Sequence, residues 1–427
     1  MALCVSSVAL CGQKKYKPTE SHREAQRATE GLLLAGIFDP MKTTLTLTAA
    51  LLITFSVFSQ DKPRARDLGV PFDGTPGMNN SISDVPGLLV GYKTLISGSG
   101  PLKAGTGPVR TGVTVILPKG KTPESYPAAW FSLNGDGEMT GLPYVEDYGM
   151  GYGAIGITNT NSVGTVRDAI GEWQFKKYST GEFIDFSAGL PNVGETWDGM
   201  MNDINGYHVK KEHVWDALDS AAGGKIREGN VGGGTGMACY GFKGGSGTAS
   251  RKFKIDSAEY TLGVFVQANF GGRNELTIAG IPVGREITGH NMILNAPKRK
   301  DGSIIVIVAT DAPLLPHQLE LVAKRISMGI ARTGTISHNG SGDIFLALST
   351  ATPQYNERGT VETWKVVPKS RIDPVYKATV EATEEAIINA LVAAEDMEGI
   401  NGNKFFALPL DQVKTILKKY NRLKVPQ

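Results

Sequence analysis

The chain has 427 residues, of which 41% are hydrophobic and 20% charged, with 53 glycines and a formal net charge of +2. This composition is that of a globular protein with excess glycine, and the length allows one large α/β core or two domains. The near-zero charge and a single basic triplet, Lys298-Arg299-Lys300, give no reason to expect nucleic-acid binding, so we expect a small-molecule or peptide ligand.

The first 60 residues have the pattern of a leader rather than of a folded domain. Met41 is followed by a lysine, an apolar run over residues 43–58 and a short polar exit. This order predicts a secretory signal peptide over 41–60 and export to the periplasm, with no stable membrane insertion after its removal. Residues 1–40 are then a mis-assigned or unusual extension. The alternative is that 43–58 forms a single membrane anchor.

Short apolar segments follow, each with the length and the flanking turn residues of a strand. They cover residues 87–92, 111–118, 129–133 and 154–158, and later 250–254 and 260–267. Between the two groups, residues 213–222 predict a short helix, and a glycine-dominated run over 230–247 would let backbone approach backbone or ligand closely. The pattern indicates a sheet with glycine-rich connections.

The cysteines and histidines predict neither a disulfide nor a metal site. Cys4 and Cys11 precede the mature chain, which leaves Cys239 as a lone thiol; we expect it to be buried and inert, the alternative being a catalytic role. The six histidines include no ligand pair on one helical face. The G-x-G-x-x-G spelling at 151–156 runs into a strand rather than a helix, so we expect no cofactor.

The segment 300–311 carries the most informative pattern. A polar approach containing Gly302 leads into Ser303, which opens an unbroken β-branched run typical of a strand buried on both faces. This predicts a strand with a nucleophile at its first residue. The alternative is that Ser303 merely ends a loop.

Helices and strands alternate after this segment. Apolar residues at helical spacing predict a helix from Pro316 to Ile330, and a tight turn over 339–343 leads into a strand over 344–348. The longest predicted helix starts near Asp373. Strands first, then helices alternating with strands, favour sheet layers covered by helices in a single domain over 61–427.

A serine nucleophile in this chain needs an unusual base, because no G-x-S-x-G elbow or obvious Ser-His-Asp set is present. A serine at a chain terminus carries its own base, since an α-amino group has a pKa of roughly 7.7–8.0. This requires cutting the chain between Gly302 and Ser303, and glycine permits the strained backbone from which a hydroxyl attacks its preceding carbonyl. Ser250 is a rival nucleophile, but the strand that follows it is charged rather than apolar.

Six strings, in order between about residue 63 and about residue 400, carry a family resemblance. They are RARDLG (64–69), TNTNSVG (158–164), EGNVGGGTGM (228–237), GIPVG (280–284), GSIIV (302–306) and NGSGDIF (339–345). The chain resembles the DmpA family of L-aminopeptidase/D-esterase and β-peptidyl aminopeptidase enzymes, and is nearer to the latter. The resemblance implies an αββα sandwich similar to the N-terminal-nucleophile hydrolases. It also implies cleavage before Ser303 into an α chain (61–302) and a β chain (303–427), in a homo-oligomer of αβ units.

The resemblance also implies roles for individual residues. Ser303 matches the nucleophile, Ser341 and Asp343 match a second serine and an acid that orient the proton relay, and Asn269 matches the oxyanion donor. Aspartate at 343 would have a shorter reach than glutamate, if the close relatives carry glutamate there. A plain turn is the alternative for Ser341 and Asp343, and a loop cap for Asn269.

An aminopeptidase must also recognise a free cationic amine, which requires a carboxylate at the end of its pocket. We expect Glu195 to supply it, the alternative being a surface glutamate. Trp197, Tyr207 and Glu138 are weaker candidates for the pocket wall. The predicted function is a self-processing aminopeptidase that releases N-terminal residues, β-amino acids in particular, from short peptides and amides. The alternatives are a D-stereospecific amidase or esterase of the same family and a non-catalytic periplasmic binding protein.

Overall fold

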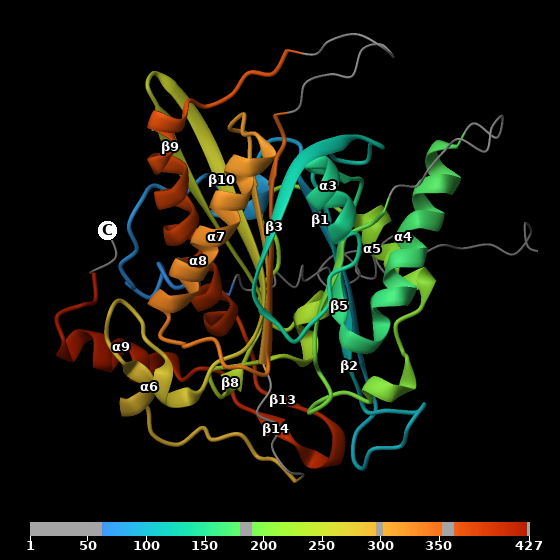
Figure 1. Ribbon diagram of the computed structural model, residues 1–427. Coiled ribbons are helices and arrows are strands. Elements are labelled where there is room, and N and C mark those ends of the chain that lie inside the picture. Colours follow the sequence, from blue (N-terminus) through green and yellow to red (C-terminus); the bar gives the residue numbers. More distant parts are fainter. Residues whose placement is uncertain (1–61, 180–189, 296–301, 352–362, 425–427) are drawn as a thin grey trace, which may run out of the picture. The chain divides into compact units, whose positions relative to one another are not determined.

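The computed structural model of the protein describes residues 62–179, 190–295, 302–351 and 363–424 (Figure 1). The predicted extension, the signal peptide, Cys4 and Cys11 lie outside the described residues. Within these ranges, no helix combines the length and the apolar character needed to cross a bilayer.

Two sheets form the centre of the fold. The four-stranded sheet has the order β1 (Leu89–Ser97), β2 (Val109–Leu117), β5 (Ile155–Asn159) and β6 (Val193–Thr196). The six-stranded sheet has the order β4 (Met150–Tyr152), β3 (Ser125–Gly135), β12 (Ser341–Ser349), β11 (Gly302–Thr310), β10 (Ala258–Asn269) and β9 (Gly245–Ile255). The short pairs β7 (Ala238–Cys239) with β8 (Phe242–Lys243), and β13 (Met397–Glu398) with β14 (Lys404–Phe405), lie outside both.

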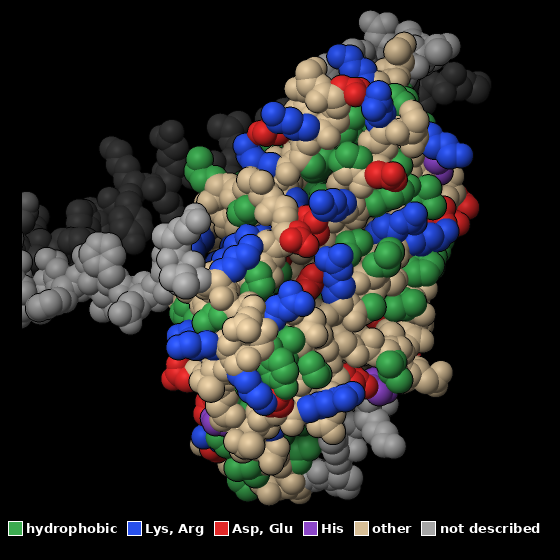
Figure 2. Space-filling model, turned by 90° about the vertical axis from the view of Figure 1, so that its left-hand side faces the viewer, with side chains coloured by type: hydrophobic (Ala, Val, Ile, Leu, Met, Phe, Trp, Pro, Cys, Tyr) green, Lys and Arg blue, Asp and Glu red, His purple; other side chains and the backbone are tan. Residues whose placement is uncertain are grey.

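Helices cover the outer face of each sheet (Figure 1). Helices α7 (Pro316–Arg332) and α8 (Asp373–Val392) pack on the six-stranded sheet, and α4 (Val163–Tyr178) and α5 (Lys211–Ser220) pack on the four-stranded sheet. The shorter helices are α3 (Leu142–Tyr148), α6 (Val283–Glu286) and α9 (Leu410–Lys419). This αββα arrangement confirms the predicted fold class. On the face that carries α8, basic side chains lie interspersed with acidic ones (Figure 2).

Strand β11 is the central element because both of its faces are buried. Ile304, Val306 and Val308 pack toward α7 and α8, whereas Ile305, Ile307 and Ala309 pack between the two sheets. The alternation follows from the period of two residues in a strand. The predicted doubly buried strand is confirmed. Because alternate residues of a strand face opposite sides, the odd-numbered position of Ser303 places it on the same side as Ile305 and Ile307.

Candidate active site

Ser303 is the second residue of β11 and faces the four-stranded sheet. It lies on the same face as Ile305 and Ile307, and it pairs with Gly342 on parallel β12 and with Asn269 on antiparallel β10. Its side chain is buried within the strand end rather than placed in a loop. The loop-end alternative for Ser303 is therefore wrong.

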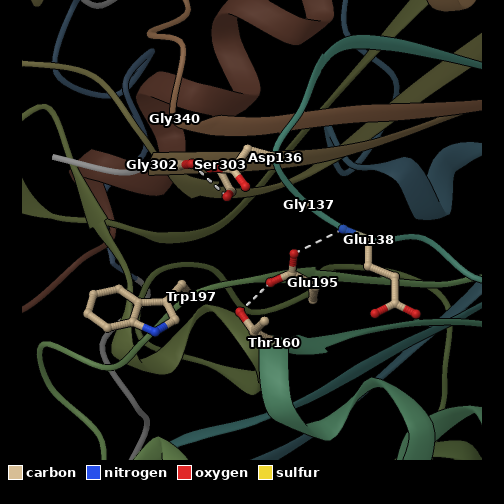
Figure 3. Close-up of a pocket in the computed structure, with 9 residues that line it drawn as sticks. All are labelled: Asp136, Gly137, Glu138, Thr160, Glu195, Trp197, Gly302, Ser303 and Gly340. Carbon is tan, nitrogen blue, oxygen red and sulfur yellow. Dashed lines mark hydrogen bonds between the residues drawn. The ribbon is translucent and has the colours of Figure 1, made fainter. Parts of the chain in front are cut away.

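A cavity of about 220 Å³ lies in front of Ser303 (Figure 3). It is lined by Asp136, Gly137, Glu138, Thr160, Glu195, Trp197, Gly302, Ser303 and Gly340. Figure 3 shows Gly302 and Ser303 on one side of this space, and Glu195 with Thr160 on the opposite side. Of the predicted residues, the structure thus brings Gly302, Ser303, Glu195, Trp197 and Glu138 to one cavity.

The Ser303 hydroxyl contacts the carbonyl that precedes it. Its Oγ donates to the Gly302 carbonyl oxygen over 2.6 Å, and the Gly342 N–H donates to the same Oγ over 3.3 Å. Gly302 does not have a left-handed backbone, so the expected strain of that kind is absent. A Cβ at this position would lie 3.0 Å from the Asn269 carbonyl oxygen and 3.0 Å from the Phe270 Cα. Close approach to β10 therefore explains the glycine.

Ser341 and Asp343 form a hydrogen-bonded pair at the start of β12. The Ser341 Oγ donates to the Asp343 carboxylate over 2.6 Å, and Ser337 donates to its other oxygen. Both residues already belong to the strand, so the predicted turn over 339–343 is too long and the plain-turn alternative is wrong. Strand parity places them on the face opposite to Ser303. Burial raises the pKa of Asp343, whereas its hydrogen bonds lower it.

The Asn269 side chain is fixed at both ends. Its Oδ1 accepts from the Ala238 N–H over 2.8 Å, and its Nδ2 donates to the Trp197 carbonyl over 3.0 Å. An amide nitrogen carries two hydrogens, so one remains for a ligand. Asn269 ends β10 opposite Ser303, which is a suitable place for a donor, and its side chain also joins the backbone of Ala238 to that of Trp197, as the loop-cap alternative expects.

Glu195 is a buried carboxylate, only 3% exposed, at the base of the cavity on β6. It accepts from the Glu138 backbone N–H over 3.1 Å and from the Thr160 hydroxyl, and none of the ion pairs among the described residues includes it. Burial raises its pKa, the hydrogen bonds from Thr160 and the Glu138 N–H oppose this shift, and the nearby charges of Glu138 and Asp136 add to it. The surface-glutamate alternative is wrong.

The contribution of Glu138 differs from the prediction. Its backbone N–H holds Glu195, while its own carboxylate points away from Ser303 (Figure 3). The segment lies close to β12 because Gly137 and Gly342 meet there; a Cβ on Gly342 would lie 2.7 Å from the Gly137 Cα. Glycine at both positions therefore lets the loop after β3 reach the site.

Asn269, Ser341 and Asp343 lie on strands next to Ser303 but do not line this cavity, and two further candidates also lie outside it. Tyr207 is 54% exposed and does not line it. Ser250 is fully buried in β9, where its Oγ accepts from the Gly77 N–H over 3.0 Å and donates to Asp84 over 2.7 Å.

Cys239 is buried, and burial raises the pKa of its thiol well above the usual range, which favours an inert thiol over a catalytic one. Within the described ranges, no group of three or more His, Cys, Asp or Glu side chains could hold a metal ion.

Four further residues line the cavity that the sequence patterns above did not indicate: Asp136, Gly137, Thr160 and Gly340. Thr160 and Gly340 lie inside strings that the family resemblance singled out, so a position-by-position reading of those strings would have included them. Asp136 and Gly137 carry a weaker signal, a Gly-Asp-Gly sequence at the end of a predicted strand.

Comparison with known proteins decides the family. The profile of peptidase family S58 matches residues 80–405. The chain belongs to this family. Among S58 relatives, "Beta-peptidyl aminopeptidase BapA" of Sphingosinicella microcystinivorans is 50% identical over 378 residues, 86% of this chain and 94% of the relative. The protein of the same name from Sphingosinicella xenopeptidilytica is 43% identical and covers 87% of this chain and 95% of its own length.

Solved structures confirm the S58 fold. The L-aminopeptidase D-Ala-esterase/amidase of Ochrobactrum anthropi, described as a prototype for the serine aminopeptidases and a new variant of the Ntn hydrolase fold, matches with a TM-score of 0.79. It is 43% identical and covers 85% of this chain and 100% of its own. A β-aminopeptidase of Burkholderia sp. matches with a TM-score of 0.75 at 42% identity, covering 84% of this chain and 99% of its own. The predicted family and fold are therefore confirmed.

Proposed function

We propose that this S58 peptidase is an exported, self-processing serine aminopeptidase that releases N-terminal residues, β-amino acids in particular, from short peptides and amides. The observation that carries the proposal is the contact of the Ser303 hydroxyl with the Gly302 carbonyl at the wall of a cavity. A buried carboxylate, Glu195, lies across that cavity. The names of the two BapA relatives, at 50% and 43% identity, support the β-peptide preference.

The geometry at Gly302 and Ser303 supports the proposed self-processing. The Ser303 Oγ attacks the Gly302 carbonyl carbon, its proton passes to the Ser303 amide nitrogen, and the C–N bond breaks as an ester forms. Water then hydrolyses the ester, which leaves a carboxylate on Gly302 and a free hydroxyl and amine on Ser303. The Gly342 N–H, which already contacts the Oγ, helps to hold the attacking oxygen.

Turnover uses the group that processing creates. The α-amine of Ser303 accepts the hydroxyl proton as the Oγ attacks the substrate carbonyl, and the free Nδ2 hydrogen of Asn269 is offered to the oxyanion. The Ser341–Asp343 pair lies on the opposite face of the neighbouring strand, in register with Gly302 and Ile304, and we expect its negative charge to stabilise the ammonium that forms at the strand end. The Ser303 ammonium then protonates the leaving amine, and water releases the acyl group.

Recognition of the substrate amine falls to Glu195. An ammonium group in the cavity would supply the cationic partner that this buried carboxylate does not have among the described residues, and it would lower the raised pKa of Glu195.

We also propose that the αβ units form a homo-oligomer, which light scattering of the purified protein would measure.

The first test separates self-processing from adventitious proteolysis. Wild type should yield two chains, the second beginning at Ser303, by denaturing electrophoresis and intact mass. Ser303→Ala should remain one chain, and Ser250→Ala, which removes the rival hydroxyl, should be processed like wild type. Cleavage of Ser303→Ala at the same bond would refute the proposal.

The second test concerns the substrate. We expect β-alanyl p-nitroanilide to be hydrolysed faster than the L-α-alanyl compound. Faster hydrolysis of D-alanyl amides or esters would favour the second candidate, a D-stereospecific amidase or esterase, which the named activity of the Ochrobactrum anthropi structure supports. Absence of hydrolysis in the processed protein would favour a binding protein.

A further inference from the structure

Lys243 is a fully buried lysine that lies close to the site and has no acidic partner. It is 0% exposed on β8, and its Nζ donates to the carbonyls of Gly244 (2.7 Å), Met237 (2.9 Å) and Gly234 (3.4 Å). Among the described residues it forms no ion pair. An ammonium group has three donors, so these three carbonyls match its charged form.

The glycine-rich run explains how backbone can surround a lysine so closely. A Cβ on Gly244 would lie 2.5 Å from the Ala268 carbonyl oxygen, and one on Gly234 would lie 2.4 Å from the Ser246 nitrogen. Side chains at these positions would push the carbonyls away from the ammonium. The run over 230–247 therefore builds a carbonyl cage around Lys243.

One of the three carbonyl groups around Lys243 belongs to a peptide that also binds Asn269. The Met237 carbonyl that binds Lys243 belongs to the same peptide group as the Ala238 N–H, which donates to the Asn269 Oδ1 over 2.8 Å. The Asn269 Nδ2 then faces the Trp197 carbonyl at 3.0 Å, and Asn269 pairs with Ser303 in the β10–β11 ladder. Lys243, the 237–238 peptide and the Asn269 amide thus form one chain of hydrogen bonds, donor to acceptor, ending next to the nucleophile.

The charge of Lys243 polarises the Asn269 amide at the end of this chain of hydrogen bonds. A cation at a carbonyl oxygen makes the N–H of the same amide a stronger donor, and successive amides polarise one another in a buried environment. No carboxylate among the described residues pairs with Lys243, so its field is not cancelled locally.

We propose that Lys243 is a positioning residue for hydrolysis, which polarises the Met237–Ala238 peptide and, through it, the Asn269 amide that binds the oxyanion. The proposal rests on the function proposed above. It adds a buried cation that touches neither substrate nor nucleophile.

The proposal predicts an effect of pH. Burial lowers the pKa of Lys243 to about 7; of the nearby groups, Cys239 opposes this shift and the Lys62 ammonium adds to it. The three carbonyl acceptors also favour the charged form. Lys243 is charged below its pKa, so a rise in pH through that value removes the charge, and kcat should fall on the alkaline side.

The experiment compares Lys243→Met and Lys243→Gln, each alone and combined with Asn269→Ala, as processed enzyme on β-alanyl p-nitroanilide. Both single variants should lose about tenfold in kcat, less than the 10²–10³ lost when an oxyanion donor is removed, with KM within about twofold. In the Asn269→Ala background, neither should cause a further loss. Lys252→Met, which removes an exposed lysine on β9, is the matched control and should leave kcat unchanged.

The Gln variant keeps two donors for the carbonyl cage, so it remains informative if Lys243→Met does not fold. Its pH profile should lack the alkaline decline seen in wild type. A wild-type kcat and profile in Lys243→Gln, or an equal loss with and without Asn269, would overturn the proposal. If Asn269→Ala alone leaves kcat unchanged, the proposed oxyanion role itself fails, and this inference with it.

Discussion

Two serines of the six-stranded sheet donate to aspartates over nearly the same distance. Ser250 donates to Asp84 over 2.7 Å, and Ser341 donates to Asp343 over 2.6 Å. Asp84 is enclosed by further donors, including the backbone N–H groups of Asn79 (2.9 Å) and Ser81 (3.1 Å). Asp343 instead lies at a strand end, next to the strand that carries Ser303 and its cavity.

The difference teaches that a hydrogen-bonded serine and carboxylate do not by themselves make a catalytic pair. The Ser250 hydroxyl accepts from the Gly77 N–H and donates its proton to Asp84. Since Ser250 is also fully buried, a substrate cannot reach it. The Ser303 hydroxyl faces a cavity and a carbonyl that it can attack. Free space in front of the nucleophile separates the catalytic region from the structural one.

The largest contrast is expected between the two aspartates. Asp343→Asn removes the negative charge that would stabilise the protonated Ser303 amine, so kcat should fall by about 10³- to 10⁴-fold, as for the acid of a catalytic triad. The measurement is kcat of the processed variant on β-alanyl p-nitroanilide. Intact mass, measured on the same sample, reports the fraction of the variant that is processed.

Asp84→Asn is the matched control for this change. It keeps the shape of the side chain and disturbs hydrogen bonds to a turn and to β9 that lie outside the cavity, so kcat should stay within about twofold while the free energy of unfolding falls by about 1–3 kcal/mol. An equal loss of kcat in both variants would mean that the two pairs do not differ as described.

A second prediction concerns the buried ion pairs behind Ser250. The Arg251 guanidinium is 1% exposed and contacts Glu385 at 2.7 Å and Glu381 at 3.6 Å. Arg251→Met would take a cationic partner from two buried carboxylates. The free energy of unfolding, measured by urea denaturation, should therefore fall by about 3–5 kcal/mol, with kcat of the folded enzyme unchanged.

The exposed pair of Arg371 with Asp256 provides the control. Arg371→Met should cost at most about 1 kcal/mol, because exposed ion pairs contribute little. If the two arginine variants were equally stable, burial of the Arg251 network would carry no energetic weight.

The same comparison shows what the sequence could predict. The β-branched run after Ser303 predicts a doubly buried strand because hydrophobic patterning is local, and the structure confirms it. Helix α4 was missed although Val163, Val166 and Ile170 lie at helical spacing, because Gly164 and a polar surface interrupt the pattern. The cavity could be predicted only in part, because Asp136 and Thr160 reach Ser303 through packing between two sheets, and such contacts leave no local pattern.

A third prediction concerns substrate binding. Glu195→Gln keeps one of the two acceptor oxygens and cannot neutralise an ammonium group. KM should therefore rise by about 10- to 100-fold, with a smaller change in kcat. Burial raises the pKa of Glu195, and the carboxylate is charged only above that pKa. In wild type KM should therefore rise as pH falls through this value, whereas the Gln variant should show no such rise.

Glu259→Gln, which alters an exposed glutamate paired with Lys252, is the control and should leave KM and its pH dependence unchanged. A Glu195→Gln variant with wild-type KM across this pH range would instead assign recognition of the amine to another carboxylate that lines the cavity, such as Asp136.

The smallest expected effect concerns Ser250, for which the sequence left open a catalytic role. Ser250→Ala removes one donor from Asp84 and leaves the Gly77 N–H without its acceptor, so the free energy of unfolding should fall by about 1–3 kcal/mol. Because neither partner reaches the cavity, kcat and KM of the processed variant should equal those of wild type, measured beside a urea unfolding curve. A loss of kcat without a loss of stability would contradict the separation of the two serines, since a structural hydroxyl can affect turnover only by way of the fold.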